Sequence, residues 1–194
     1  MKIFSLLTLL SLAPALCHAA VSIVDVSSPF GGSKTMLSSY GQTFTPTITG
    51  TLDGLRLYVA SPPKGAVISV SVWDYDVGSQ KLGSILGSGS YIVPANFLSY
   101  QWIDVLFSTK ISQIAERPLA FTVSNPSVMG PAISSTSQYI GGAFFEFSGS
   151  QAVTLTPRDL TFQTMVTAIP ESQGSSLLGA ATALAAFRRK RAGA

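Results

Sequence analysis

Short runs in which apolar and polar residues alternate, separated by turn residues, fill the chain from about residue 20 to residue 168. In "AVISVSVWDYD", for example, Ile68, Val70 and Val72 alternate with serines. Successive side chains of a strand point to opposite faces, so this pattern is typical of a strand with one buried face. The chain is therefore predicted to build its core from strands.

Ten such runs, rich in β-branched and aromatic residues, recur along this part of the chain. They are residues 21–27, 41–48, 51–60, 66–76, 89–95, 100–108, 118–125, 137–149, 151–156 and 159–168. Gly54, inside the third run, is expected to mark a β-bulge. The nearest approach to a helical stripe is 107–116, where at most one short turn is expected. Many strands without intervening helices predict an all-β domain, a single antiparallel β-sandwich of the jelly-roll type.

The N-terminus has the organisation of a secretory signal, expected to form a signal helix. Lys2 precedes a ten-residue apolar stretch, Ile3 to Leu12, which is too short to span a bilayer, and small residues follow it. The expected cut lies between Ala19 and Ala20, and a cut after Ala15 is the alternative. Residues 1–19 are thus predicted to be a signal peptide removed by signal peptidase.

This cut would remove two residue types, cysteine and histidine, on which many enzymes rely. Cys17 and His18 are the chain's one cysteine and one histidine, and both lie before the cut. A lipoprotein interpretation of Cys17 is disfavoured because Leu16, not a small residue, precedes it. The mature protein would have no disulfide, so its core alone must stabilise it.

The net charge of the chain is also set by its ends. The whole chain carries +3, but residues 20–168 contain seven Lys and Arg against eight Asp and Glu, a net charge of −1. Nucleic-acid binding relies on a basic surface over the folded domain. The near-neutral body therefore argues against a nucleic-acid partner.

The C-terminal stretch reads "IPESQGSSLLGAATALAAFRRKRAGA". Its apolar part, Leu177 to Phe187, extends to thirteen residues from Ser175. A helix of that length would be roughly 20 Å long, short of the ~30 Å hydrocarbon core of a membrane. The basic residues that follow would be held on the cytoplasmic side, with the body outside.

This order of Pro-Glu, short apolar helix and basic cluster resembles the PEP-CTERM sorting signal of Gram-negative bacteria. The residues that carry the resemblance are Pro170, Glu171, Arg188, Arg189, Lys190 and Arg191. Ser172 stands where the family has a second proline. The resemblance implies that residues 169–194 hold the protein transiently in the inner membrane until an exosortase, a membrane cysteine protease, releases the body. An ordinary tail anchor is the alternative.

The body, residues 20–168, is similar to poorly characterised β-sandwich domains that often precede such signals. The sequence segments that carry this similarity are "GQTFTPTITGTLDGLRLYV", "VSVWDYDVGSQKLGS", "QWIDVLFS" and "ERPLAFTVS". The similarity implies adhesive or carbohydrate-associated roles rather than an activity.

Residue types in the body argue against an enzyme. Without histidine there is no Ser-His-acid triad, and no G-x-S-x-G, phosphate-binding or dinucleotide motif is present. Zinc would find only carboxylates as strong ligands. A glycosidase would need two carboxyls facing each other across a cleft, which the sequence does not place. The expectation is a non-enzymatic protein without a resident cofactor.

Two binding hypotheses remain, for Ca²⁺ and for sugar. Asp74 and Asp76, two apart at a strand end, could supply oxygen ligands to Ca²⁺, or could simply end a strand and begin a turn. Trp73, Tyr100 and Trp102 could stack on sugar rings, or could fill the core. In "YQWIDVLF" the alternation puts Trp102 on the polar face, opposite Ile103.

Together these patterns predict an exported cell-surface or extracellular-matrix protein, sorted through its C-terminus. Its expected contacts are signal peptidase, an exosortase, the inner membrane for a time, and extracellular polysaccharide. The alternative is an adhesin that resembles a carbohydrate-binding module and uses exposed aromatic residues, with or without Ca²⁺.

Overall fold

The computed structural model describes residues 22–28, 39–124, 133–134, 139–146, 154–156 and 158–169. Every regular element in these ranges is a β-strand, and no helix occurs in them. Across the same ranges, nothing helical is long and apolar enough to cross a membrane. The signal-cleavage residues Ala19 and Ala20 and the sorting segment from Pro170 onward, with both expected terminal helices, lie outside the described residues.

Twelve strands are present in the described ranges. Their bounds are β1 (Ser22–Ser27), β2 (Ser39–Phe44), β3 (Gly50–Val59), β4 (Val67–Asp76), β5 (Lys81–Ile92), β6 (Gln101–Gln113), β7 (Leu119–Ser124), β8 (Ile133–Ser134), β9 (Phe144–Glu146), β10 (Thr154–Thr156), β11 (Asp159–Leu160) and β12 (Phe162–Ala168).

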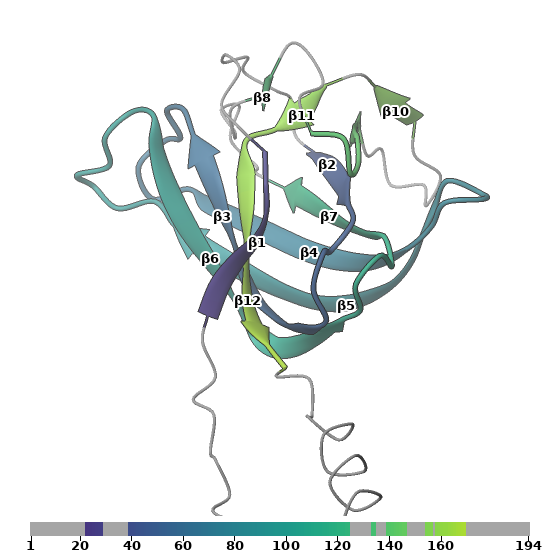
Figure 1. Cartoon of the computed structure of the whole chain (residues 1–194). Helices are drawn as coiled ribbons and strands as arrows, with labels where there is room; N and C mark the ends of the chain where they lie inside the picture. The colour runs from purple at the N-terminus through teal and green to yellow at the C-terminus, as the bar shows by residue number, and fades with distance from the viewer. Residues whose placement is uncertain are drawn as a thin grey trace, which may run out of the picture.

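Ten of these strands form one antiparallel sheet that curls back on itself, as Figure 1 shows. Its order is β1-β12-β3-β6-β5-β4-β7-β2-β9-β10, and β11 pairs separately with β8. The prediction of an all-β, antiparallel domain is confirmed. The described strands form one continuous curled sheet, a half-barrel, so the finer expectation of a jelly-roll sandwich is not confirmed.

The sheet turns its corner where β5 meets β6, and only Gly89 and Phe107 pair across this junction. A Cβ on Gly89 would overlap the carbonyl oxygen of Leu106, and one on Gly87 would lie 2.7 Å from Ile111 Cδ1. Glycine at these two positions lets β6 cross close over β5. The corner divides the sheet into one half with β1, β12, β3 and β6 and another with β5, β4, β7, β2, β9 and β10.

The main core fills the space between the two halves. Leu55 and Leu57 of β3, Val70 and Val72 of β4 and Phe121 of β7 are all fully buried there. The rings of Phe44, Phe121 and Phe162 contact one another with centroids 5.0 to 6.2 Å apart. Burial of these apolar side chains holds the two halves of the curled sheet against each other.

A smaller apolar group, the second cluster, lies on the opposite, outer face of the β4 half. Its members are Trp73, Tyr75, Leu82, Ala120, Phe145 and Leu155. Trp73 follows Val72 of the main core along β4, and Ala120 precedes Phe121 along β7, so alternation places the cluster outside. This face is therefore partly apolar as well as partly polar.

Most predicted strands are present, and two predictions differ from the structure. The expected bulge at Gly54 is confirmed, because the pairing of β3 with β6 shifts between Leu52 and Gly54. The strand expected at 100–108 continues as β6 to Gln113, and the one short turn allowed for in 107–116 lies at Ala115 and Glu116. The strand expected at 89–95 is the end of a longer β5 that begins at Lys81.

Candidate functional site

Two rows of hydroxyl side chains cross the outer face of the sheet beside its corner. Ser69 of β4 pairs with Ser90 of β5 on one side and with Ser124 of β7 on the other. One step along, Ser71 pairs with Ser88 and Thr122. Paired strands lie about 4.8 Å apart, and the rows are about 7 Å apart because alternate residues share a face.

These serines line a groove of about 540 Å³, here called the serine groove. Its lining residues come from β4, β5 and β6, and they are Ser69, Val70, Ser71, Ser88, Gly89, Ser90, Leu106, Phe107 and Ser108. Leu106 is 64% exposed, whereas Phe107 is partly buried against the main core. The groove thus combines several hydroxyls with apolar surface at one wall.

The hydroxyls of the groove are largely unused by the protein. Within the described ranges, no side-chain hydrogen bond is formed by the hydroxyls of Ser69, Ser71, Ser88 or Ser90. Ser108 donates a hydrogen bond to the main-chain carbonyl of Ser88, at 3.4 Å. Each serine hydroxyl is both a donor and an acceptor, so four of them can exchange hydrogen bonds with a bound molecule.

Among the described residues, none that lines the serine groove is charged. The nearest ion pair along β6 joins Asp104 Oδ1 to Arg56 Nε at 2.7 Å and lies outside the lining. The hydrogen bond and the negative charge of Asp104 raise the pKa of Arg56. Hydrolysis of a glycosidic bond would need two carboxyls in the groove, and none of its described lining residues carries one. Its chemistry is that of an uncharged, hydrogen-bonding surface.

Trp73, one of the predicted sugar-binding residues, lies on the same outer face as Ser71. It is half-buried in the second cluster, and its Nε1 donates a hydrogen bond to Thr122 Oγ1 at 2.9 Å. The ring is therefore fixed in orientation and keeps part of its surface accessible.

Trp102, in β6, and Tyr100, just before that strand, are the other predicted aromatic residues, and neither lines the groove. Trp102 is 39% exposed and meets the ring of Tyr58 edge-on at 5.3 Å. Its predicted placement on the outer face is confirmed, because Ile103 and Val105 are buried. Trp73 packs in the second cluster, so the structure does not bring the three predicted aromatics together.

Asp74 and Asp76, the predicted Ca²⁺ ligands, both have partners. Asp74 Oδ1 accepts a hydrogen bond from Arg117 Nη2 at 3.0 Å. Asp76 accepts hydrogen bonds from the main-chain nitrogens of Gly78 and Ser79 and from the Ser79 hydroxyl. No three Asp, Glu, His or Cys side chains gather in the described ranges in a way that could hold a metal ion. Ca²⁺ binding at this pair stays a prediction.

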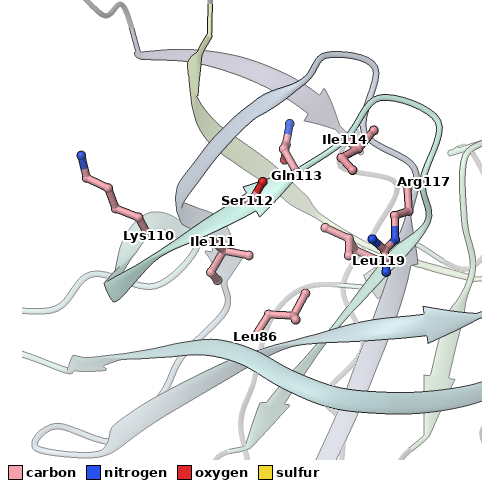
Figure 2. Close-up of a pocket in the computed structure, with 8 residues that line it drawn as sticks. All are labelled: Leu86, Lys110, Ile111, Ser112, Gln113, Ile114, Arg117 and Leu119. Carbon is pink, nitrogen blue, oxygen red and sulfur yellow. The ribbon is translucent and has the colours of Figure 1, made fainter.

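A second cavity, of about 280 Å³, opens on the other side of the corner (Figure 2). Leu86 of β5 faces Ile111 of β6 and Leu119 of β7 across it, and Lys110 and Arg117 lie at its two ends. Arg117 is already paired with Asp74. Four of its lining residues are apolar and four are polar or charged, and the two charged ones distinguish its lining from that of the serine groove.

The serines of the groove form no motif that a single sequence would mark as a site. The alternation in "VISVSVW" places Ser69 and Ser71 on one face, and "SGS" in 88–90 does the same for its two serines. The missing information was the register, which pairs Ser69 with Ser90 and Ser71 with Ser88.

No known protein-family model matches this chain, and no curated protein is similar enough to match it.

Proposed function

We propose that the chain is an exported, non-enzymatic protein of the cell surface or extracellular matrix whose body, of jelly-roll type, binds a neutral polysaccharide in the serine groove. The proposed location is a Gram-negative cell, with transient anchoring in the inner membrane. Ca²⁺ at Asp74 and Asp76 and sugar stacking on Trp102 and Tyr100 remain secondary parts of the proposal.

The observation that carries the polysaccharide proposal is the set of unused hydroxyls in an uncharged groove. Sugars present many hydroxyls that both donate and accept, and serine hydroxyls complement them without selecting for charge. Leu106 adds apolar surface for the C–H faces of a sugar ring. The ligand expected from this lining is a neutral glycan rather than an anionic one.

The groove is tested by removing its hydroxyls in pairs. Ser71→Ala with Ser88→Ala should weaken binding to a neutral glucan, mannan or galactan about tenfold, since each lost hydrogen bond contributes about 1 kcal/mol or less. Affinity electrophoresis in gels containing each polysaccharide measures this. Ser84→Ala, an exposed serine of β5 outside the groove, is the matched control. Equal mobility of the double variant and the control in every gel would contradict the proposal.

The sorting part is supported by the sequence alone. In a host with an intact exosortase system, the chain should lose its tail near Pro170 and Glu171 and leave the membrane fraction. Deleting the exosortase, or changing Glu171→Ala, should keep the tail and the membrane association. Mass spectrometry of a body-tagged chain separates the two states, and an intact tail in every strain would favour the ordinary anchor.

A further inference from the structure

A third cavity, of about 310 Å³, lies on the same outer face as the serine groove and is here called the Tyr75 pocket. Apolar side chains of Val77, Pro118, Ile140 and Leu155 line it together with Tyr75. None of its described lining residues is charged. Its volume is at the lower end of the range for small-molecule sites, so it suits a substituent rather than a whole sugar chain.

Tyr75 lines this pocket and carries an unusual hydroxyl. Tyr75 is only 8% exposed, and its hydroxyl has no hydrogen-bond partner among the described residues. Burial, with a smaller effect from the charge of Asp76, raises the pKa of Tyr75, so the phenol keeps its proton at neutral pH. A buried donor without an acceptor destabilises a folded protein.

The two threonine hydroxyls of the pocket are already used. Thr45 Oγ1 donates to the carbonyl of Gly141 at 2.8 Å, and Thr43 Oγ1 accepts from the nitrogen of Ala143 at 2.8 Å. Gln80 is exposed and lies in the lining, where its amide can meet polar groups outside. A ligand that fits this pocket would therefore carry an apolar group with one hydrogen-bond acceptor oxygen. That group would be attached to a polar molecule.

The Tyr75 pocket and the serine groove lie along one strand. Ser69, Ser71, Trp73 and Tyr75 alternate along β4 and share its outer face. Tyr75 lies four residues beyond Ser71, about 13 Å at roughly 3.3 Å per residue. A glycan in the groove would therefore pass Trp73 and reach the pocket within a few sugar units.

We propose that the Tyr75 pocket binds an acyl substituent of the polysaccharide, an acetamido group or acetyl ester, with its methyl group among the apolar side chains and its carbonyl oxygen accepting from the Tyr75 hydroxyl. This inference rests on the proposed function, because the pocket would bind a substituent of the same glycan that the serine groove binds. It specifies the ligand as an acylated neutral polysaccharide.

The test compares two neutral β-1,4-linked tetrasaccharides, cellotetraose and tetra-N-acetylchitotetraose, by calorimetric titration of the purified full chain. The two differ in the acetamido group. The acetylated sugar should bind about tenfold more tightly, and Tyr75→Phe should remove most of that difference while leaving cellotetraose binding unchanged. Tyr75→Phe should also unfold at the same or a higher temperature, because it removes a buried group without a partner.

Tyr40→Phe is the matched control. The Tyr40 hydroxyl is also buried without a partner in the described ranges, but Tyr40 lines neither the serine groove nor the Tyr75 pocket. It should change neither affinity. Equal binding of the two sugars by the unaltered protein would overturn the acyl inference and leave the groove proposal standing. Failure of both sugars to bind, together with no retardation of the protein in any of the polysaccharide gels, would overturn both.

Discussion

The carboxylate of Asp76 closes the turn between β4 and β5. It accepts from the Ser79 hydroxyl at 2.6 Å and from the main-chain nitrogen of Gly78 at 2.9 Å. The hydrogen bond from the Ser79 side chain, followed by those from the main chain, lowers the pKa of Asp76 below its ordinary value. The stabilising effect of the charged carboxylate is therefore present above the ordinary Asp pKa and is lost as the pH falls through the lower, folded pKa.

Replacing Ser79 with Ala should raise the pKa of Asp76 toward the ordinary value of about 3.9, because the largest cause of the shift is removed. The carboxyl carbon resonance of Asp76, followed by NMR through an acid titration, measures this directly. Ser84→Ala, which touches no group of this turn in the described structure, should leave the titration unchanged. An unaltered Asp76 titration in Ser79→Ala would show that the main chain alone holds the carboxylate.

Gly41 of β2 is a second residue with a specific role, because the ring of Phe145 lies against it. A Cβ at position 41 would lie 2.6 Å from Phe145 Cε2 and would overlap both Phe145 Cζ and the carbonyl oxygen of Phe121. Phe145 is fully buried in the second cluster, so its ring has no room to withdraw. The close approach requires glycine here.

Gly41→Ala should lower the free energy of unfolding by about 3 kcal/mol, at the upper end of the usual cost of overpacking, since main chain obstructs it on one side. Gly78→Ala is the control, because its Cβ would meet nothing closer than Asp76 Oδ1 at 3.4 Å, and its effect should stay within about 0.5 kcal/mol. Urea denaturation of both variants tests the difference. Similar stabilities would mean that Phe145 repacks freely.

Among the elements, β5 and β6 decide the shape of the sheet at their crossing. The obstacle to a Cβ on Gly89 is the main-chain carbonyl of Leu106, whereas the obstacles at Gly87 are the end of the Ile111 side chain and the Thr109 hydroxyl. Main chain yields less readily than the end of a side chain. Gly89→Ala should therefore destabilise the protein more than Gly87→Ala, by at least about 1 kcal/mol.

Parallel urea titrations of the two glycine variants measure this order. The Gly89 variant should also lose part of the serine groove, because Gly89 is one of the residues that line this groove. If Gly87→Ala proved the more damaging change, packing of Ile111 rather than contact between the two strands would set the corner.

Strand alternation explains which elements could be predicted from the sequence. In β6, Ile103 and Val105 are buried while Trp102 and Asp104 face outward, as the pattern predicts. The pairing of β5 with β4 is interrupted between Val72 and Trp73 and again before Tyr75. The first half of β5 therefore lacks a regular alternation of buried and exposed side chains, and the sequence pattern does not predict it. Bulges of this kind depend on the partner strand and leave no clear local signal.

The candidate site was less predictable than the strands for the same reason. Ser69 and Ser71 have a recognisable outward pattern, but the groove also needs Leu106 and Ser108 from a strand about forty residues later. The Tyr75 pocket likewise needs Ile140 and Leu155, which a sequence pattern cannot bring to the β4–β5 turn. Both sites arise from the long-range register and the curl of the sheet.

At the scale of the whole molecule, the two ends of the described body lie side by side. Ser22 of β1 pairs with Thr167 of β12, and the two strands run antiparallel at one edge of the sheet (Figure 1). The chain therefore enters and leaves the domain at neighbouring positions. A body held by its C-terminal tail would be attached to the membrane at this edge, next to the strand that follows the expected signal peptide.

The distribution of charge predicts how the full chain meets a membrane. The body carries a net charge of −1, whereas Arg188, Arg189, Lys190 and Arg191 put four positive charges at the end of the tail. Basic residues near an anionic bilayer contribute about 1 kcal/mol each, and salt screens the attraction. Changing these four residues to Gln should therefore weaken binding of the full chain to phosphatidylcholine vesicles containing phosphatidylglycerol by at least about a hundredfold.

Vesicle sedimentation at low and high salt measures this binding. Vesicles of phosphatidylcholine alone are the control, since they should retain only the contribution of the apolar stretch from 177 to 187 and should bind both chains equally. If the Gln variant still bound the anionic vesicles as tightly, the near-neutral body would itself have to contact the membrane. The charge argument for the tail as the membrane-directed end would then be wrong.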